Sequence, residues 1–288
     1  MQKLEKWLEN IDCEGDLELI SSRENSKKFY RLSSSMHRGI VMDASLCKEV
    51  VEPFIEIEHR LYEAGVKVAK VFTYNKREGF LFMEDLGDTH LFDIINIDFE
   101  LFYGQALDSI MKIQNTETED LPLLDEKLLR SQMALVLKDV EKSKHTKLNA
   151  IFDLIVLEVF SQPCDVFVHG NFYSKNIMFG CSDNIVLIDY ENAKIGAITY
   201  DLVSLLRDSF VEFEKEDVER FALAFRDKIG LDVDDATFMR WFDFTGLQRH
   251  IYLLSKEDIV ENSSLLKKYI DEMASKYIEI ESLSEMIC

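Results

Sequence analysis

Amide and carboxylate side chains lie next to short apolar runs in the second half of the chain. One run leads into His169, the polar stretch after it ends at Asn176, and a second apolar run, 177–179, follows directly. Another run, 185–188, leads directly into Asp189. Short apolar runs bounded by polar turn residues are typical of strands. We therefore expect a hairpin that holds the Asn176 amide and the Asp189 carboxylate at the same end.

These two side chains predict a metal site. Amide and carboxylate oxygens are hard ligands that suit Mg²⁺, an ion that keeps several waters and takes phosphate oxygens for its other positions. Asn176 and Asp189 are therefore predicted metal ligands. In the alternative interpretation, Asp189 caps a turn in an ordinary polar loop, which leaves the ordered set of residues unexplained.

Strand-like patterns fill the part of the chain before residue 85. Five short apolar-rich runs predict strands at 17–21, 28–32, 39–42, 68–73 and 79–83. Between the third and the fourth, apolar residues three and four positions apart predict a helix over 44–64 that ends at Gly65.

Helical periodicity dominates after residue 85. It covers 99–114, 126–141 and 148–160 and returns from residue 200, while the β-rich segment 165–188 interrupts it. No Ser-, Gly- or Pro-rich linker separates the two parts. We therefore predict two packed lobes, residues 1–85 and 86–288, joined by a short hinge.

The composition excludes several classes of protein. Of 288 residues, 33 are Lys or Arg and 54 are Asp or Glu, which gives a formal charge of −21. Phosphate backbones and anionic lipid repel such a chain, so nucleic-acid and membrane partners are not expected. The N-terminus lacks the pattern of a secretory signal, and no apolar stretch is long enough to span a bilayer. Five scattered cysteines without a C-x-x-C pair indicate reduced thiols in a cytoplasmic protein.

The segment from His169 to Asn176 resembles the catalytic loop of eukaryotic-like kinases, H-x-D-x-x-x-x-N, and Asp189 takes the position of their Asp-Phe-Gly metal ligand. The Ile-Asp-Tyr-Glu form of 188–191 is similar to the aminoglycoside phosphotransferase and choline kinase branch, whose members phosphorylate small molecules. Four further segments resemble bacterial anomeric sugar kinases of cell-wall recycling, which phosphorylate C1 of N-acetylmuramate or N-acetylglucosamine: 41–44, 82–87, 199–208 and 241–250.

The resemblance runs from about residue 17 to residue 250 and implies an α+β fold of the bilobal protein-kinase-like kind. The small β-rich N-lobe would bind the nucleotide, and the larger, mainly helical C-lobe would hold the catalytic loop and the acceptor site. ATP and Mg²⁺ are the implied cofactors. The adenine is expected against the hinge backbone at Met83, Glu84 and Leu86.

Phosphate contacts in the small lobe depart from the kinase pattern. Protein kinases place a lysine on the third strand, but 39–43 contains none, and the loop 21–28 has no glycine. Lys27, Lys28 or Arg31 could reach the phosphates instead. The alternative is that these residues belong to a solvated hairpin tip.

The catalytic aspartate of the family falls at Asn171. An amide oxygen accepts a hydrogen bond from a substrate hydroxyl but takes up no proton, and general-base help is worth roughly 10²–10⁴ in rate. Phosphoryl transfer relies mainly on positioning and charge neutralisation, and an anomeric hydroxyl is more acidic than an ordinary sugar hydroxyl. A kinase that works without this base and a catalytically impaired nucleotide-binding pseudokinase are therefore both open hypotheses, and an engineered Asp-to-Asn change is a third explanation.

The sequence favours an ATP-dependent phosphotransferase that acts on a small-molecule hydroxyl, best matched by the anomeric hydroxyl of an N-acetylated amino sugar. Glu191 could assist through a metal-bound water. Arg249 and His250 could bind the sugar's carboxylate or N-acetyl group, although an intramolecular salt bridge explains them equally well. The alternative acceptors are choline or aminoglycoside-type alcohols: the charge of −21 suits such a cation, whereas Arg249 and His250 do not.

Overall fold

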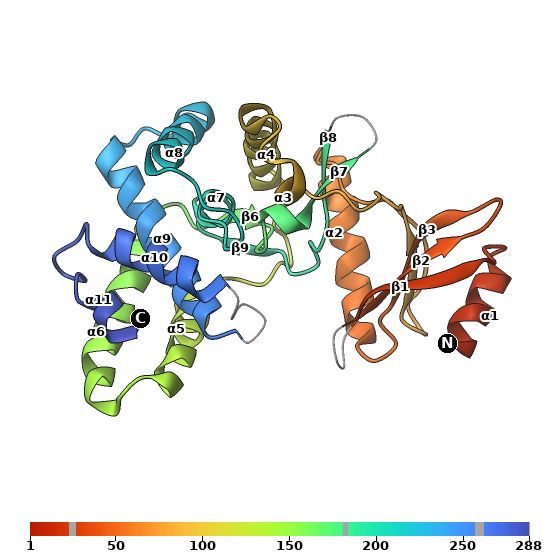
Figure 1. Ribbon diagram of the computed structural model, residues 1–288, viewed down its shortest axis with the longest axis horizontal. Coiled ribbons are helices and arrows are strands. Elements are labelled where there is room, and N and C mark those ends of the chain that lie inside the picture. The colour runs from red at the N-terminus through yellow and green to blue at the C-terminus, as the bar shows by residue number, and fades with distance from the viewer. Residues whose placement is uncertain (23–26, 181–183, 257–261, 288) are drawn as a thin grey trace.

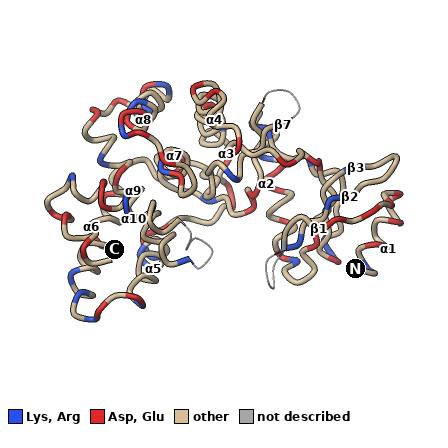
Figure 2. Tube along the Cα trace, in the orientation of Figure 1, with Lys and Arg blue, Asp and Glu red and all other residues tan. Residues whose placement is uncertain are grey.

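The computed structural model describes residues 1–22, 27–180, 184–256 and 262–287. A small lobe built around an antiparallel sheet lies beside a larger helical lobe (Figure 1). This is the bilobal α+β architecture that the sequence predicts. Acidic residues are spread over both lobes rather than gathered on one element (Figure 2).

The N-lobe sheet has the order β1-β2-β3-β5-β4, and all neighbours pair antiparallel. Its strands are β1 (Asp16–Ser22), β2 (Lys28–Ser33), β3 (Arg38–Asp43), β4 (Val71–Asn75) and β5 (Phe80–Met83). The predicted order of three strands, a helix and two strands is confirmed, although β4 begins later than expected. The helix α2 (Val51–Glu63) ends before Gly65, whose φ of +74° suits a glycine at a helix C-terminus.

Side-chain alternation gives the sheet two buried faces. The N-terminal helix α1 (Gln2–Asn10), which the sequence analysis did not predict, covers one face and packs against Tyr30, Leu32 and Val41. Helix α2 covers the other face (Figure 1), where it shares a core with Met42. Residues of β2 with even numbers therefore face α1, and those with odd numbers face the rest of the molecule.

The C-lobe is organised around one long helix, α9 (Asp235–Leu254), whose side chains are buried on all sides from 241 to 251. It packs against α5 (Glu126–Ala134), α6 (His145–Val159), α7 (Tyr200–Leu206), α8 (Lys215–Ile229) and α10 (Ser263–Ala274). The remaining helices are α3 (Leu91–Ile94), α4 (Phe99–Gln114) and α11 (Leu283–Ile287). A helix without an exposed face belongs to the centre of a lobe.

Two small sheets carry the segment with the predicted metal ligands. The hairpin β7 (Ile177–Gly180) and β8 (Asn184–Leu187) pairs Ile177 with Leu187, so the ends that adjoin Asn176 and Asp189 lie together as predicted. Strand β6 (Val166–Val168) pairs with β9 (Lys194–Gly196), a three-residue strand that the sequence did not reveal.

The lobes are tied together next to this hairpin. The amide of Leu187 donates to the Lys67 carbonyl at 2.9 Å, and the Tyr190 hydroxyl donates to the Ala69 carbonyl at 3.2 Å. The Tyr190 ring also packs on Phe54 of α2, with ring centroids 4.7 Å apart. One hydrophobic core therefore continues from α2 into the C-lobe.

Within the described residues, no helix has both the length and the apolar character that a membrane span requires. Cys13, Cys47 and Cys164 carry free thiols. Cys181 and Cys288 lie outside the described residues.

Candidate active site

The end of the β7–β8 hairpin gathers three oxygen-bearing side chains. The Asn176 amide nitrogen lies 3.5 Å from an Asp189 carboxylate oxygen. Asp189 has a φ of +61°, a left-handed conformation that aspartate tolerates better than most residues. Glu191 is buried, and its Oε2 has no hydrogen-bond partner among the described residues.

This group of oxygens is suited to a cation. The ammonium of Lys27 already lies 3.4 Å from Asp189 Oδ1 and contacts Glu191 Oε1. Burial, and then the negative charge of Asp189, raises the pKa of Glu191. A divalent cation would offset both effects and occupy the unpartnered oxygen, and hard oxygen donors are what Mg²⁺ prefers. The residues present therefore fit Mg²⁺.

The segment 169–176, which is the predicted catalytic loop, is held in place by Asp201, a fully buried residue of α7. Its two carboxylate oxygens accept the backbone amides of His169 at 2.6 Å and of Gly170 at 3.0 Å. Burial raises the pKa of Asp201. Asp201 therefore braces this loop from inside the C-lobe.

His169 is a structural residue in the same loop. Its Nδ1 accepts the Asn171 amide at 3.2 Å, so the ring proton resides on Nε2, which lies 3.1 Å from the Ile188 carbonyl. Burial lowers the pKa of His169 and keeps the ring neutral. This ring fixes the spacing between the catalytic loop and the strand that delivers Asp189.

Asn171 is positioned by its backbone and leaves its side chain free. Its carbonyl accepts hydrogen bonds from the Asn176 side chain and the Tyr173 amide, each at 3.0 Å. Asn171 lines a cavity, and its carboxamide makes no hydrogen bond to any described residue. It is therefore available to a bound molecule.

The cavity has a volume of about 390 Å³ and extends from Asn171 and Asp189 to α9. This size is typical of small-molecule sites. Its described lining includes four cationic side chains, Lys194, Arg207, Arg249 and Lys256. Arg249 forms part of the floor, where it donates to the Gly170 carbonyl at 3.0 Å and to the Tyr200 hydroxyl at 3.3 Å.

The predicted adenine contacts lie where β5 leaves the sheet. Met83 is the last residue of β5, and the Glu84 amide donates to the Lys70 carbonyl at 2.9 Å. In the described part of the chain, the Glu84 carbonyl and the Leu86 amide have no hydrogen-bond partner. These two backbone groups are therefore free to meet a ligand.

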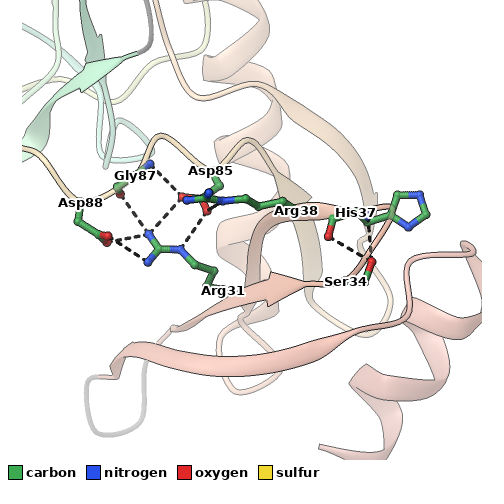
Figure 3. A network of polar contacts seen from close by, with 7 residues as sticks. All are labelled: Arg31, Ser34, His37, Arg38, Asp85, Gly87 and Asp88. Carbon is green, nitrogen blue, oxygen red and sulfur yellow. Dashed lines mark hydrogen bonds and ion pairs between the residues drawn. The ribbon is translucent and has the colours of Figure 1, made fainter.

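Arg31, a predicted phosphate contact, is instead held at the hinge. Figure 3 shows Arg31 and Arg38 converging on Asp85. Arg31 Nε lies 3.0 Å and Arg38 Nε 2.7 Å from Asp85 Oδ2, and Arg31 also reaches Asp88 at 2.7 Å. Burial opposes ionisation of Asp85, but hydrogen bonds from Arg38, Gly87 and Arg31 lower its pKa overall. Arg31 is therefore a brace between β2 and the hinge.

Lys27, rather than Lys28, faces the candidate metal site. Lys28 lies on the same face of β2 as Tyr30 and Leu32, which pack against α1 on the opposite side of the sheet. Lys27 points to the other side of the sheet and contacts Asp189. The period-two pattern of β2 could have separated these neighbouring lysines from sequence alone.

His250, a predicted acceptor contact, lies outside the lining of the cavity. The ring is fully buried in α9, its nitrogens face the Gly246 and Arg207 carbonyls, and it does not line the cavity. The structure thus separates His250 from its neighbour Arg249, because successive residues of a helix point to different sides.

Burial makes His250 a source of pH-dependent stability. Burial lowers its pKa to about 4 from an ordinary 6.5, in spite of the two facing carbonyls. The neutral ring is thus fully stabilising above pH 6.5, and the stabilisation is lost as the pH falls from 6.5 towards 4. We expect the free energy of unfolding to fall by roughly 3 kcal/mol across this window.

Denaturant unfolding of the native protein and of His250→Gln, measured at several pH values, checks this expectation. The variant should lose much of the pH dependence, whereas His59→Gln, at an exposed position, should retain it. Equal pH dependence in all three proteins would contradict the assignment.

Comparisons with known proteins agree with this architecture. The sequence model of the APH family, described as a phosphotransferase enzyme family, matches residues 16–242. The chain is 26% identical to an N-acetylmuramate/N-acetylglucosamine kinase of Pseudomonas putida, with 95% of this chain and 88% of the relative covered. It is 29% identical to a protein of the same name from Neisseria meningitidis, with 86% and 80% covered.

Two solved structures show the same fold. Choline kinase LicA from Streptococcus pneumoniae superposes with a TM-score of 0.69 at 14% identity, covering 95% of this chain and 98% of that one. A thermostable mutant of aminoglycoside phosphotransferase APH(4)-Ia, in a ternary complex with ADP and hygromycin B, superposes with a TM-score of 0.65 at 13% identity, covering 94% and 97%.

Proposed function

The chain belongs to the APH phosphotransferase enzyme family, and from this premise we propose that it is an ATP-dependent kinase of the anomeric hydroxyl of an N-acetylated amino sugar. The observation that carries the proposal is the cavity of about 390 Å³ that extends from Asn171 and Asp189. The names of the relatives from Pseudomonas putida and Neisseria meningitidis support the choice of acceptor.

In this proposal the nucleotide binds between the lobes. The adenine meets the free backbone groups of Glu84 and Leu86, next to Met83. Asn176 and Asp189 hold Mg²⁺, with Glu191 beside them, and the ion when bound supplies charge neutralisation for the transferring phosphoryl group. The ADP complex of the structural neighbour supports nucleotide use by this fold.

Asn171 positions the acceptor. Its free carboxamide oxygen accepts a hydrogen bond from the sugar hydroxyl, whose oxygen forms the new bond to the γ-phosphorus as the bond to ADP breaks. Because the amide takes up no proton, the hydroxyl proton passes to the phosphate product or to solvent. Positioning supplies most of the catalysis in phosphoryl transfer, so turnover proceeds without a general base.

The charges of the cavity favour an anionic acceptor. Its described lining contains four cations and one carboxylate, Asp189. Arg207 is already paired with Glu272 at 2.9 Å, so Lys194, Arg249 and Lys256 carry the excess positive charge, which would repel cationic acceptors such as choline and aminoglycosides. A catalytically silent binding protein is the second candidate, and it is favoured by Asn171, which stands where the family has its catalytic aspartate. The pairing of Asn176 with Asp189 supports catalysis, since a silent protein has no chemical need for both residues.

Lys194 is proposed to bind the acceptor's carboxylate. Its half-buried ammonium lines the cavity and donates to the Asn192 carbonyl at 3.0 Å, with further donors free. We expect Lys194→Met to raise KM for N-acetylmuramate about tenfold, the worth of one charge-assisted hydrogen bond. N-acetylglucosamine lacks the carboxylate and serves as the internal control, with KM within about twofold. An equal rise for both sugars would contradict this role.

Release of ADP with a panel of acceptors tests the function. We expect activity with N-acetylmuramate and N-acetylglucosamine and none above the background ATPase rate with choline or kanamycin. Activity with choline or kanamycin alone would overturn the sugar assignment.

A further inference from the structure

Lys27 links the two lobes across the candidate nucleotide site. It immediately precedes β2 in the N-lobe, and its ammonium lies 3.4 Å from Asp189 Oδ1 and contacts Glu191 Oε1 in the C-lobe. The Lys27 side chain is only 15% exposed and that of Glu191 only 6%. Among the ion pairs of the described residues, neither carboxylate has another cationic partner.

The ammonium occupies the position that a metal ion needs. With both carboxylates ionised, Asp189, Glu191 and Lys27 have a formal charge sum of −1, and Glu191 Oε2 still lacks a partner in the described structure. A divalent cation on the carboxylates changes that sum to +1 and releases the ammonium. A site with that charge attracts the polyphosphate of ATP.

The remainder of the described N-lobe offers the phosphates little other positive charge at this point. On β3, Ile40 and Met42 lie on the face of the sheet that packs towards the core, and both are apolar. Arg31 and Arg38 are both engaged by Asp85 (Figure 3). A lysine is a compact point charge on a flexible stem, which suits a contact that changes partner.

We propose that Lys27 exchanges partners when nucleotide binds. In the nucleotide-free protein it holds the carboxylates of Asp189 and Glu191 together, and after a divalent cation takes these carboxylates it binds phosphate oxygens of ATP. Lys27 thereby serves as the phosphate-binding lysine that β3 lacks. This inference rests on the proposed function, because it assigns a contact at the same site.

Binding measurements on the full chain test the exchange. Lys27→Met should bind Mn²⁺ about tenfold more tightly in the absence of nucleotide, measured by electron paramagnetic resonance, because the competing ammonium is gone. The same variant should bind ATP about tenfold more weakly at saturating Mg²⁺, measured by calorimetry. Lys28→Met is the matched control and should change neither affinity by more than about twofold.

Opposite shifts of the two affinities are the signature of partner exchange. Lys27→Arg keeps the charge and should retain most of the ATP affinity, which guards against a variant that merely folds poorly. Unchanged affinities in Lys27→Met, or equal effects in Lys28→Met, would overturn the inference and leave the proposed function standing. Absence of ATP binding by the native protein would overturn the proposed function itself.

Discussion

Asp189→Asn is expected to lower the kcat for amino-sugar phosphorylation about a thousandfold while the protein stays folded. The substitution removes the negative charge that faces the proposed metal ion, and charge neutralisation by that ion contributes several kcal/mol in phosphoryl transfer. The asparagine keeps the shape of the side chain at a φ of +61°, which asparagine also tolerates. The measurements are kcat at saturating sugar and the affinity for Mg-ATP.

The matched control for this variant is Asp165→Asn, an exposed carboxylate shortly before β6 in the same lobe. It should retain native kcat and native Mg-ATP affinity. If Asp189→Ala or Asp189→Asn leaves the Mg-ATP affinity unchanged, Asp189 is not a metal ligand, and the assignment of Asn176 beside it loses its basis.

Asn171→Asp is expected to raise kcat about a hundredfold. Asn171 lines the cavity, and a carboxylate in place of its carboxamide would accept the hydroxyl proton as well as orient the hydroxyl. General-base help is worth roughly 10²–10⁴ in rate, and the acidity of an anomeric hydroxyl places the gain towards the lower end. Steady-state kinetics at pH 7.5 with saturating Mg-ATP measure the effect.

Asn171→Ala provides the contrast, since it removes the hydrogen bond and supplies no base. The expected order of kcat is therefore aspartate, then asparagine, then alanine. If the aspartate variant is no faster than the native protein, Asn171 does not contact the reacting hydroxyl. If only the aspartate variant forms product, the native chain is a binding protein.

The hairpin beside Asn176 and Asp189 could be predicted from sequence because its information is local. Asn176 directly precedes one apolar run and Asp189 follows the next, so the two residues are only thirteen positions apart. Helix α1 could also have been recognised, because Leu4, Trp7 and Leu8 follow the helical period and are buried.

The contacts of the site that sequence reasoning did not predict join distant segments. Lys27 meets Asp189 across 162 positions, and no local pattern links them. Asp208 is a similar case: the structure buries it, and it accepts the Ser174 amide at 2.7 Å and so fixes the catalytic loop. From the sequence, Asp208 looks like one more surface carboxylate.

His250 and Arg249 show why sequence alone could not decide which residues line the cavity. Both lie on α9, which is surrounded by other elements, so its sequence has no single apolar face from which orientation could be inferred. Only the packing of α9 decides that Arg249 lines the cavity while His250 turns to the Arg207 carbonyl.

Phosphorus NMR of the reaction products tests the central claim most directly. The native protein is incubated with Mg-ATP and either N-acetylmuramate or N-acetylglucosamine, and the phosphorylated position is assigned from coupling between phosphorus and the sugar protons. We predict a sugar 1-phosphate formed in step with ADP. A phosphate on any other hydroxyl, or no sugar phosphate from either the native protein or Asn171→Asp, would contradict an anomeric sugar kinase.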